Sequence, residues 1–182
     1  MRILYFVIIC LSFAACSGVK VLPSESAEGV NWQQYKSFDF YQVDASGDTV
    51  SAQFASGIAV LKESIATQMK QRGYVQQSAQ PDLLINIGLV VKEQVQTRQT
   101  DWRTDGAPRY MGQRNYSWKS EEVEVGRYRE GTVTVHIVDA LRKQLLWKGA
   151  AKGVIPDKQQ KLPAMADDAM KQVFEKYPGK VQ

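Results

Sequence analysis

Cys16 is the residue whose sequence context most clearly predicts a chemical role. It follows Ala14-Ala15, and these small residues end an apolar run over residues 3–13 that begins directly after Arg2. A positive start, an apolar segment of about 7–15 residues and small residues at the cleavage point are typical of a secretory signal. The pattern predicts that residues 1–15 are removed and that Cys16 becomes the first residue, with its thiol available for acylation.

This start resembles the signals of bacterial lipoproteins, in which the cysteine after the small residues carries a diacylglycerol. The resemblance implies a lipid on the sulfur of Cys16, with palmitate among its acyl chains, and a protein held on the cell envelope by several chains together. Ser17 follows where an Asp would be the usual signal for retention in the inner membrane. By resemblance to lipoprotein sorting in diderm bacteria, we expect attachment to the outer membrane, facing the periplasm.

Cysteine usage leaves few other roles for sulfur chemistry. The chain has two cysteines, and the second, Cys10, lies inside the signal segment and would be removed with it. We therefore expect no disulfide, no thiol metal site and no catalytic cysteine in the processed chain. The net charge of +4 is mildly basic and does not indicate a nucleic-acid partner. No glycine-rich phosphate-binding motif is present, so we expect no cofactor.

The remaining residues that could do acid–base chemistry do not form a recognisable constellation. His136 is the single histidine, and one histidine without cysteine ligands makes a zinc site a poor prediction. Asp139 ends the same strand and is expected to shape a turn, since Asp side chains accept hydrogen bonds from nearby backbone N–H groups. Asp167-Asp168 fall early in a helix, where acidic groups are favourable. We predict no catalytic residues and no metal site.

Residues 98–118 interrupt the regular pattern and combine aromatic with arginine side chains. A segment this long without its own structure is uncommon in a compact domain unless it is functional, and aromatic and Arg residues dominate interface energetics. Alternatively, the segment is a long hairpin tip whose aromatics lie on the sheet. If it binds a partner, the candidate residues are Trp102, Arg103, Arg109, Tyr110, Arg114, Tyr116 and Trp118.

The elements that would position these residues follow from hydrophobic periodicity. Residues 16–29 are polar and read as a flexible tether. Apolar residues at three- and four-residue steps predict helices over 51–72 and 163–176, and alternation predicts strands. The strands are expected at 37–42, 83–97, 122–125, 131–139 and 144–150, with a turn at 44–48. The fold class is α/β of the α+β type: a mostly antiparallel sheet with two helices packed on one face, in the order β-α-β-β-β-β-α.

Short segments, in a consistent order, resemble a known family. They are Asn31-Trp32 with Gln34-Tyr35-Lys36-Ser37-Phe38, Arg72-Gly73-Tyr74, Pro81-Asp82-Leu83-Leu84-Ile85, Glu130-Gly131-Thr132, Leu145-Leu146-Trp147-Lys148-Gly149 and Tyr177-Pro178-Gly179. They are similar to the bacterial lipoprotein family called domain of unknown function 4136. The resemblance covers residues 30–179, which we take as a single domain. It implies a fold and an envelope location, and it supplies no catalytic residues.

Together these features predict a lipid-anchored protein of the bacterial cell envelope that binds or assembles rather than catalyses. Its partner would be an envelope protein or a glycan. Two alternatives remain open from the sequence: an enzyme acting on cell-wall or glycan substrates, and a structural subunit that adds its sheet edge to a partner. The sequence does not determine the oligomeric state.

Overall fold

The computed structural model describes residues 18–47, 52–106 and 119–179 of the chain. The expected signal segment, with Cys16, lies outside these residues. The elements in chain order are β1 (Val19–Val21), β2 (Glu25–Ser26), η1 (Trp32–Gln34), β3 (Ser37–Gly47), α1 (Ala52–Gln71), β4 (Val75–Gln76), β5 (Leu83–Gln99), η2 (Trp102–Gly106), β6 (Glu122–Asp139), β7 (Leu145–Val154), η4 (Gln159–Lys161) and α2 (Leu162–Phe174). Among the described residues, no helix is long and apolar enough to cross a membrane.

The strands form one seven-stranded sheet in the order β1-β7-β6-β5-β3-β4, and β2 also pairs with β7. The pairs that involve β6 or β7 are antiparallel, whereas β3 runs parallel to both β5 and β4. The sheet is therefore mixed, and the prediction of a mostly antiparallel sheet is wrong. The reason is the connection, because α1 carries the chain from β3 back to the start of the sheet and parallel strands need such a crossover.

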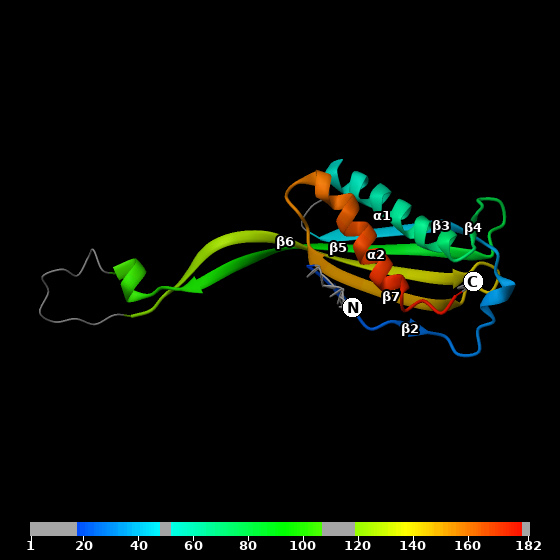
Figure 1. Cartoon of the computed structure of the whole chain (residues 1–182), viewed down its shortest axis with the longest axis horizontal. Helices are drawn as coiled ribbons and strands as arrows, with labels where there is room; N and C mark the ends of the chain where they lie inside the picture. The colour runs from blue at the N-terminus through cyan, green and yellow to red at the C-terminus, as the bar shows by residue number, and fades with distance from the viewer. Residues whose placement is uncertain (1–17, 48–51, 107–118, 180–182) are drawn as a thin grey trace, which may run out of the picture.

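The α+β class and the two main helices are as predicted. Both helices cover the same face of the sheet, with α1 and α2 packed side by side (Figure 1). Helix α1 ends at Gln71 because Gly73 adopts a left-handed φ of 84°, which the sequence had indicated as the stop. Pro163 stands in the first turn of α2, as expected.

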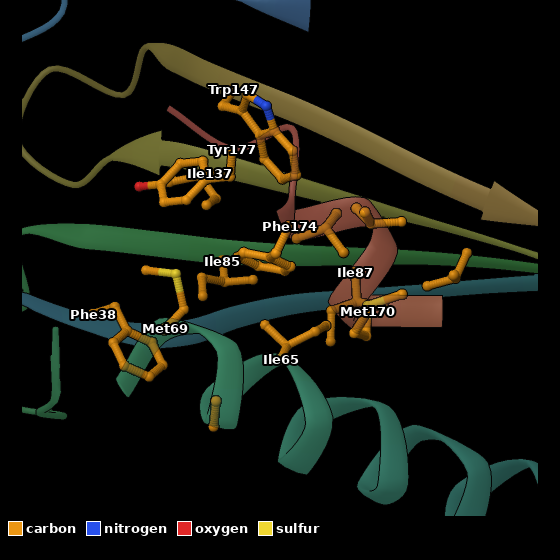
Figure 2. Close-up of a cluster of buried hydrophobic side chains, with 14 of the residues drawn as sticks. Phe38, Ile65, Met69, Ile85, Ile87, Ile137, Trp147, Met170, Phe174 and Tyr177 are labelled. Carbon is orange, nitrogen blue, oxygen red and sulfur yellow. The ribbon is translucent and has the colours of Figure 1, made fainter. Parts of the chain in front are cut away.

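The core lies between the helices and the sheet. Odd-numbered residues from Leu83 to Val91 are buried on β5, which confirms the predicted inward face. They meet Ile65 and Met69 from α1 and Met170 and Phe174 from α2 (Figure 2). Trp147, Phe174 and Tyr177 form an aromatic cluster at one end of this core, with ring centroids 5.0–5.6 Å apart.

Two stretches differ from the sequence-based expectation. Residues 19–21 and 25–26, placed in the flexible tether, are paired with β7, so the prediction of a flexible tether over all of 16–29 needs correction. Residues 44–47 were expected in a turn but continue β3, paired with residues 88–91 of β5. The causes differ. Residues 44–47 are exposed on both faces, so no alternation marks them as a strand. In β1 only Val19 and Val21 face the core, which is too short a pattern to predict a strand.

A third difference concerns β6. The sequence predicts separate strands at 122–125 and 131–139, whereas a single strand runs from Glu122 to Asp139. Its outer half pairs with the outer half of β5 as far as Gln99 opposite Glu122. These outer halves continue the sheet beyond the region that the helices cover.

Candidate functional site

A two-stranded ribbon projects from the body of the protein at one end of the sheet (Figure 1). We call it the arm: residues 92–99 of β5, residues 100–106 and 119–121, and residues 122–128 of β6. The last pair between β3 and β5 is Gly47 with Val91, and β7 pairs with β6 only as far as Glu130. Eight residues at about 3.4 Å each extend roughly 27 Å. The arm therefore protrudes well beyond the helices.

The arm has no buried face. Inward alternation on β5 stops at Val91, and residues 92–99 are exposed or half-exposed. Large side chains nevertheless lie open to solvent along it, namely Val95, Val125 and Tyr128. A single exposed apolar residue is ordinary, but an unburied ribbon that carries several of them presents contact area without contributing to the core.

Arg127 forms one ion pair within β6 and one that joins the two strands of the arm. The Arg127 guanidinium donates to Glu124 at 2.6 Å and lies 3.6 Å from Glu93 on β5. The hydrogen bond to Glu124 is the main cause of the raised pKa of Arg127 and of the lowered pKa of Glu124. All of these groups are exposed, so the pairs fix geometry more than they stabilise the fold.

Toward its end the arm carries a compact turn. Arg98 donates two hydrogen bonds to Asp105, at 2.6 and 2.8 Å, and Asp105 also accepts from the backbone N–H of Asp101. The Arg98 hydrogen bonds hold the pKa of Asp105 well below its usual range. This bidentate pair closes the start of the turn around η2.

The structure places only part of the predicted binding loop. Arg103 lies exposed in η2, with its backbone N–H bonded to Asp101, and Trp102 begins the same element. The other five candidates lie outside the described residues: Arg109, Tyr110, Arg114, Tyr116 and Trp118. Sequence reasoning extended β5 to residue 97 but did not assign a partner-facing role to residues 92–97 and 122–128. The signal was present, since apolar alternation ends at Val91 and resumes at Val133.

His136 does not form a catalytic pair in the described structure. It lies half-buried on β6, level with Asn86 of β5 and Lys148 of β7. Burial, followed by the charge of Lys148, lowers the pKa of His136, so the imidazole is neutral at neutral pH. No nucleophile or orienting carboxylate is hydrogen-bonded to it among the described residues.

Two carboxylates at the end of the sheet opposite the arm hold turns in place. Asp139 accepts from the backbone N–H groups of Leu141 and Arg142 at 2.9 and 2.7 Å, as its predicted turn role requires. Its second oxygen accepts from the Tyr35 hydroxyl at 2.9 Å. Burial alone raises the pKa of Asp139, but these hydrogen bonds outweigh it and hold the pKa below its usual value.

Asp82 plays the same kind of part between β3 and β5, which sequence reasoning missed. One of its oxygens accepts from the backbone N–H groups of Lys36 and Ser37 at 2.8 and 2.9 Å and from the Ser37 hydroxyl at 3.0 Å. Asp82 and Asp139 already accept several hydrogen bonds each, so their chemistry is structural. Among the described residues, no group of three or more His, Cys, Asp or Glu could hold a metal ion.

Comparison with solved structures finds a similar fold at low identity. The chain matches a PDZ domain protein from Parabacteroides distasonis with a TM-score of 0.51 and 16% identity, over 90% of this chain and 37% of that one. It thus spans little more than a third of that protein. A PelC dodecamer subunit from Paraburkholderia phytofirmans gives a TM-score of 0.49 and 10% identity, covering 90% and 99% of the two chains. No curated protein is similar to the sequence.

A family model provides the assignment. It is described as domain of unknown function (DUF4136) and matches residues 24–179, which is most of the chain and includes the whole sheet except β1. The segments that resemble this family in the sequence include residues that pack in the core or hold turns, among them Asp82, Trp147 and Tyr177. The chain therefore belongs to the family described as domain of unknown function (DUF4136).

Proposed function

We propose that this protein is a non-enzymatic binding or assembly module of the bacterial cell envelope, anchored by a lipid on Cys16, and that it contacts its partner through the arm. The observation that carries the proposal is the arm itself. Binding residues are commonly placed on extensions that a rigid scaffold positions, and here β5 and β6 run without interruption from the core into the exposed ribbon.

The physical cost of the arm supports a role in recognition. An isolated two-stranded hairpin is marginally stable in water, and this one lacks an apolar face of its own. Its ladder persists because it continues a ladder anchored in the core. Exposed Val95, Val125 and Tyr128 offer apolar contact, and the charged groups around them offer polar contact. An envelope protein or a glycan would suit this mixed surface.

No specific observation favours the enzyme alternative. Among the described residues, His136 lacks a catalytic partner, and Asp82 and Asp139 are engaged by backbone donors. For the alternative in which an edge strand pairs with a partner, the β7 edge already carries β1 and β2.

A site-specific crosslinking experiment tests the arm. A photoreactive phenylalanine analogue is placed at Gln96 or Val125 in the arm and, as the control, at Leu141, which is 89% exposed at the opposite end of the sheet. We expect crosslinked adducts from both arm positions in intact cells and none from position 141. Equal adducts at all three positions, or adducts only at 141, would contradict the arm proposal.

The same proposal predicts the effect of shortening the arm. Replacing residues 95–127 with Asn-Gly joins Gln94 to Tyr128, a cross-strand pair, through a two-residue turn that suits hairpins. We expect the melting temperature to change by less than about 4 °C, because the pairing of β3 and β7 with these strands ends at Val91 and Glu130, outside the removed part. Adducts formed by a probe at position 94 should fall at least tenfold. Retention of these adducts would place the contact elsewhere.

The lipid anchor is tested separately. We expect Cys16→Ser to abolish labelling by an alkyne analogue of palmitate and to release the protein from the membrane fraction, because several acyl chains are needed for stable anchoring. Ser17→Ala, next to the acceptor, is the matched control and should label normally. Unchanged labelling of Cys16→Ser would refute the anchor without bearing on the arm.

A further inference from the structure

An apolar cavity of about 140 Å³ lies between the two helices and the sheet, close to the base of the arm. Gly57 and Leu61 line it from α1, Leu162 and Met165 from α2, and Leu89 and Val133 from the sheet. The cavity is partly open to solvent, and Val19 of β1 also borders it. The cavity is thus a pocket with a mouth, not a sealed packing defect.

Gly57 is an unusual residue for the helix α1 that forms this wall of the pocket. Glycine in the interior of a helix is destabilising relative to alanine, and α1 has several residues on either side of this position. A Cβ added at Gly57 would approach no atom more closely than the Leu162 side chain, at 3.8 Å, which is ordinary contact. Steric crowding therefore does not require glycine here. Its absent side chain leaves the pocket open.

Arg129 lines the pocket from β6. Lys152 also borders it, but its side chain lies on the opposite face of the sheet, because Ala151 and Gly153 face the helices and side chains alternate along β7. Lys152 is neutralised by Glu130, whose carboxylate lies 3.0 Å from the ammonium group.

Arg129 is half-buried, and within the described part of the chain its guanidinium makes no hydrogen bond or ion pair. The residue opposite it on β5, Glu93, lies 3.6 Å from the Arg127 guanidinium. A cation beside an apolar pocket favours an amphipathic ligand with an anionic head.

We propose that this pocket binds the hydrocarbon chain of a fatty acid, with the carboxylate held at Arg129. An engineered apolar cavity of about 150 Å³ accepts benzene, so this one has room for roughly six carbon atoms of the chain. The remaining carbons span the mouth toward Arg129, whose planar fork suits a carboxylate. The site is separate from the arm strands' exposed surface and does not depend on the proposed arm contact.

The proposal predicts how affinity varies with chain length and head group. Burial of each methylene strengthens binding about fourfold, so affinity should rise from hexanoate to decanoate and then level off once the pocket is full. Decanol has the same chain without the charge. Because a hydrogen bond to a charged group is stronger than one between neutral groups, decanol should bind about tenfold more weakly than decanoate.

Isothermal titration calorimetry with decanoate and decanol tests this, using the full chain carrying Cys16→Ser so that no acyl group of its own competes. Gly57→Leu fills the pocket from a position that tolerates a larger side chain, and we expect at least a tenfold loss for both ligands. Ala59→Leu, exposed on the same helix, is the control and should bind as the parent does. Circular dichroism checks that each variant is folded.

Arg129→Gln keeps the test decisive if Gly57→Leu does not fold. It should weaken decanoate about tenfold and leave decanol unchanged, whereas Arg142→Gln, an exposed arginine at the opposite end of the sheet, should change neither. The proposal is overturned if decanoate does not bind the parent below 1 mM, if folded Gly57→Leu binds as tightly as the parent, or if decanol binds as tightly as decanoate.

Discussion

Replacing Trp147 with alanine is expected to lower the free energy of unfolding by about 3–5 kcal/mol. Trp147 is 1% exposed, and its indole contacts the rings of Phe174 and Tyr177. The change would leave a large cavity between β7 and the end of α2. Urea denaturation followed by circular dichroism measures the effect. A loss below about 1 kcal/mol would contradict the packing that Figure 2 shows.

Trp147→Phe is the matched variant for this prediction. The indole Nε1 is buried without a hydrogen-bond partner among the described residues, so the phenyl ring removes an unsatisfied donor while it keeps aromatic contact. We expect this variant to lose much less than the alanine variant. Gly149 belongs to the same arrangement, because a Cβ there would lie 2.2 Å from the Trp147 ring. The ring thus occupies the space that a side chain at 149 would need.

Replacing Asp139 with alanine is expected to cost about 3 kcal/mol. In the parent protein the Tyr35 hydroxyl and the two backbone N–H groups of the turn donate to this buried carboxylate. The alanine variant leaves all three donors without this acceptor. Arg142→Ala serves as the control. Its side chain is 63% exposed, so removing it should cost less than about 1 kcal/mol. Similar losses for the two variants would mean that the ion pair, not the backbone donors, stabilises the turn.

The stabilisation that Asp139 provides is also expected to depend on pH. Its pKa is lowered in the folded protein, so the stabilisation from its ionised form is present above the unfolded-state value of about 3.9 and is lost as pH falls through the folded value. We expect Asp139→Asn to be less stable than the parent at pH 7. The difference should shrink below pH 4. A difference that stays constant with pH would contradict the assigned ionisation.

The parts of the fold that could be predicted from the sequence are those whose packing is written in local periodicity. Ile65 and Met69 fall on one helical stripe, and Leu83, Ile85 and Ile87 alternate on one strand, so burial on one face determines both patterns. Gly73 marks a helix end by its chemistry alone. The hairpin of 131–139 with 144–150 was found for the same reason as β5.

The other parts of the fold depend on residues distant in the sequence, and no local pattern identifies these partners. Val19 and Val21 are too few to reveal a strand, and only β7 gives them their place. In the sequence Asp82 resembles an ordinary turn residue. Its role depends on the backbone N–H groups of residues 36 and 37, which only the fold places next to it. The arm was partly visible, as a continued strand and an aromatic, basic segment. The length of the arm depends on the pairing of residues 92–99 with 122–130. This pairing buries no hydrophobic face, so the sequence contains no periodic pattern that predicts it.

The docking of β1 bears on how far the protein can reach. Val19 pairs with Gly153, which pairs in turn with Gly131, so the chain joins the sheet at the end from which the arm leaves. With Cys16 lipidated as proposed, two residues separate the anchor from β1, and the three steps from Cys16 to Val19 span about 10 Å at full extension. The ribbon, at roughly 27 Å, is more than twice as long. The distance between the membrane and a bound partner would then depend mainly on the length of the arm and less on the length of the tether.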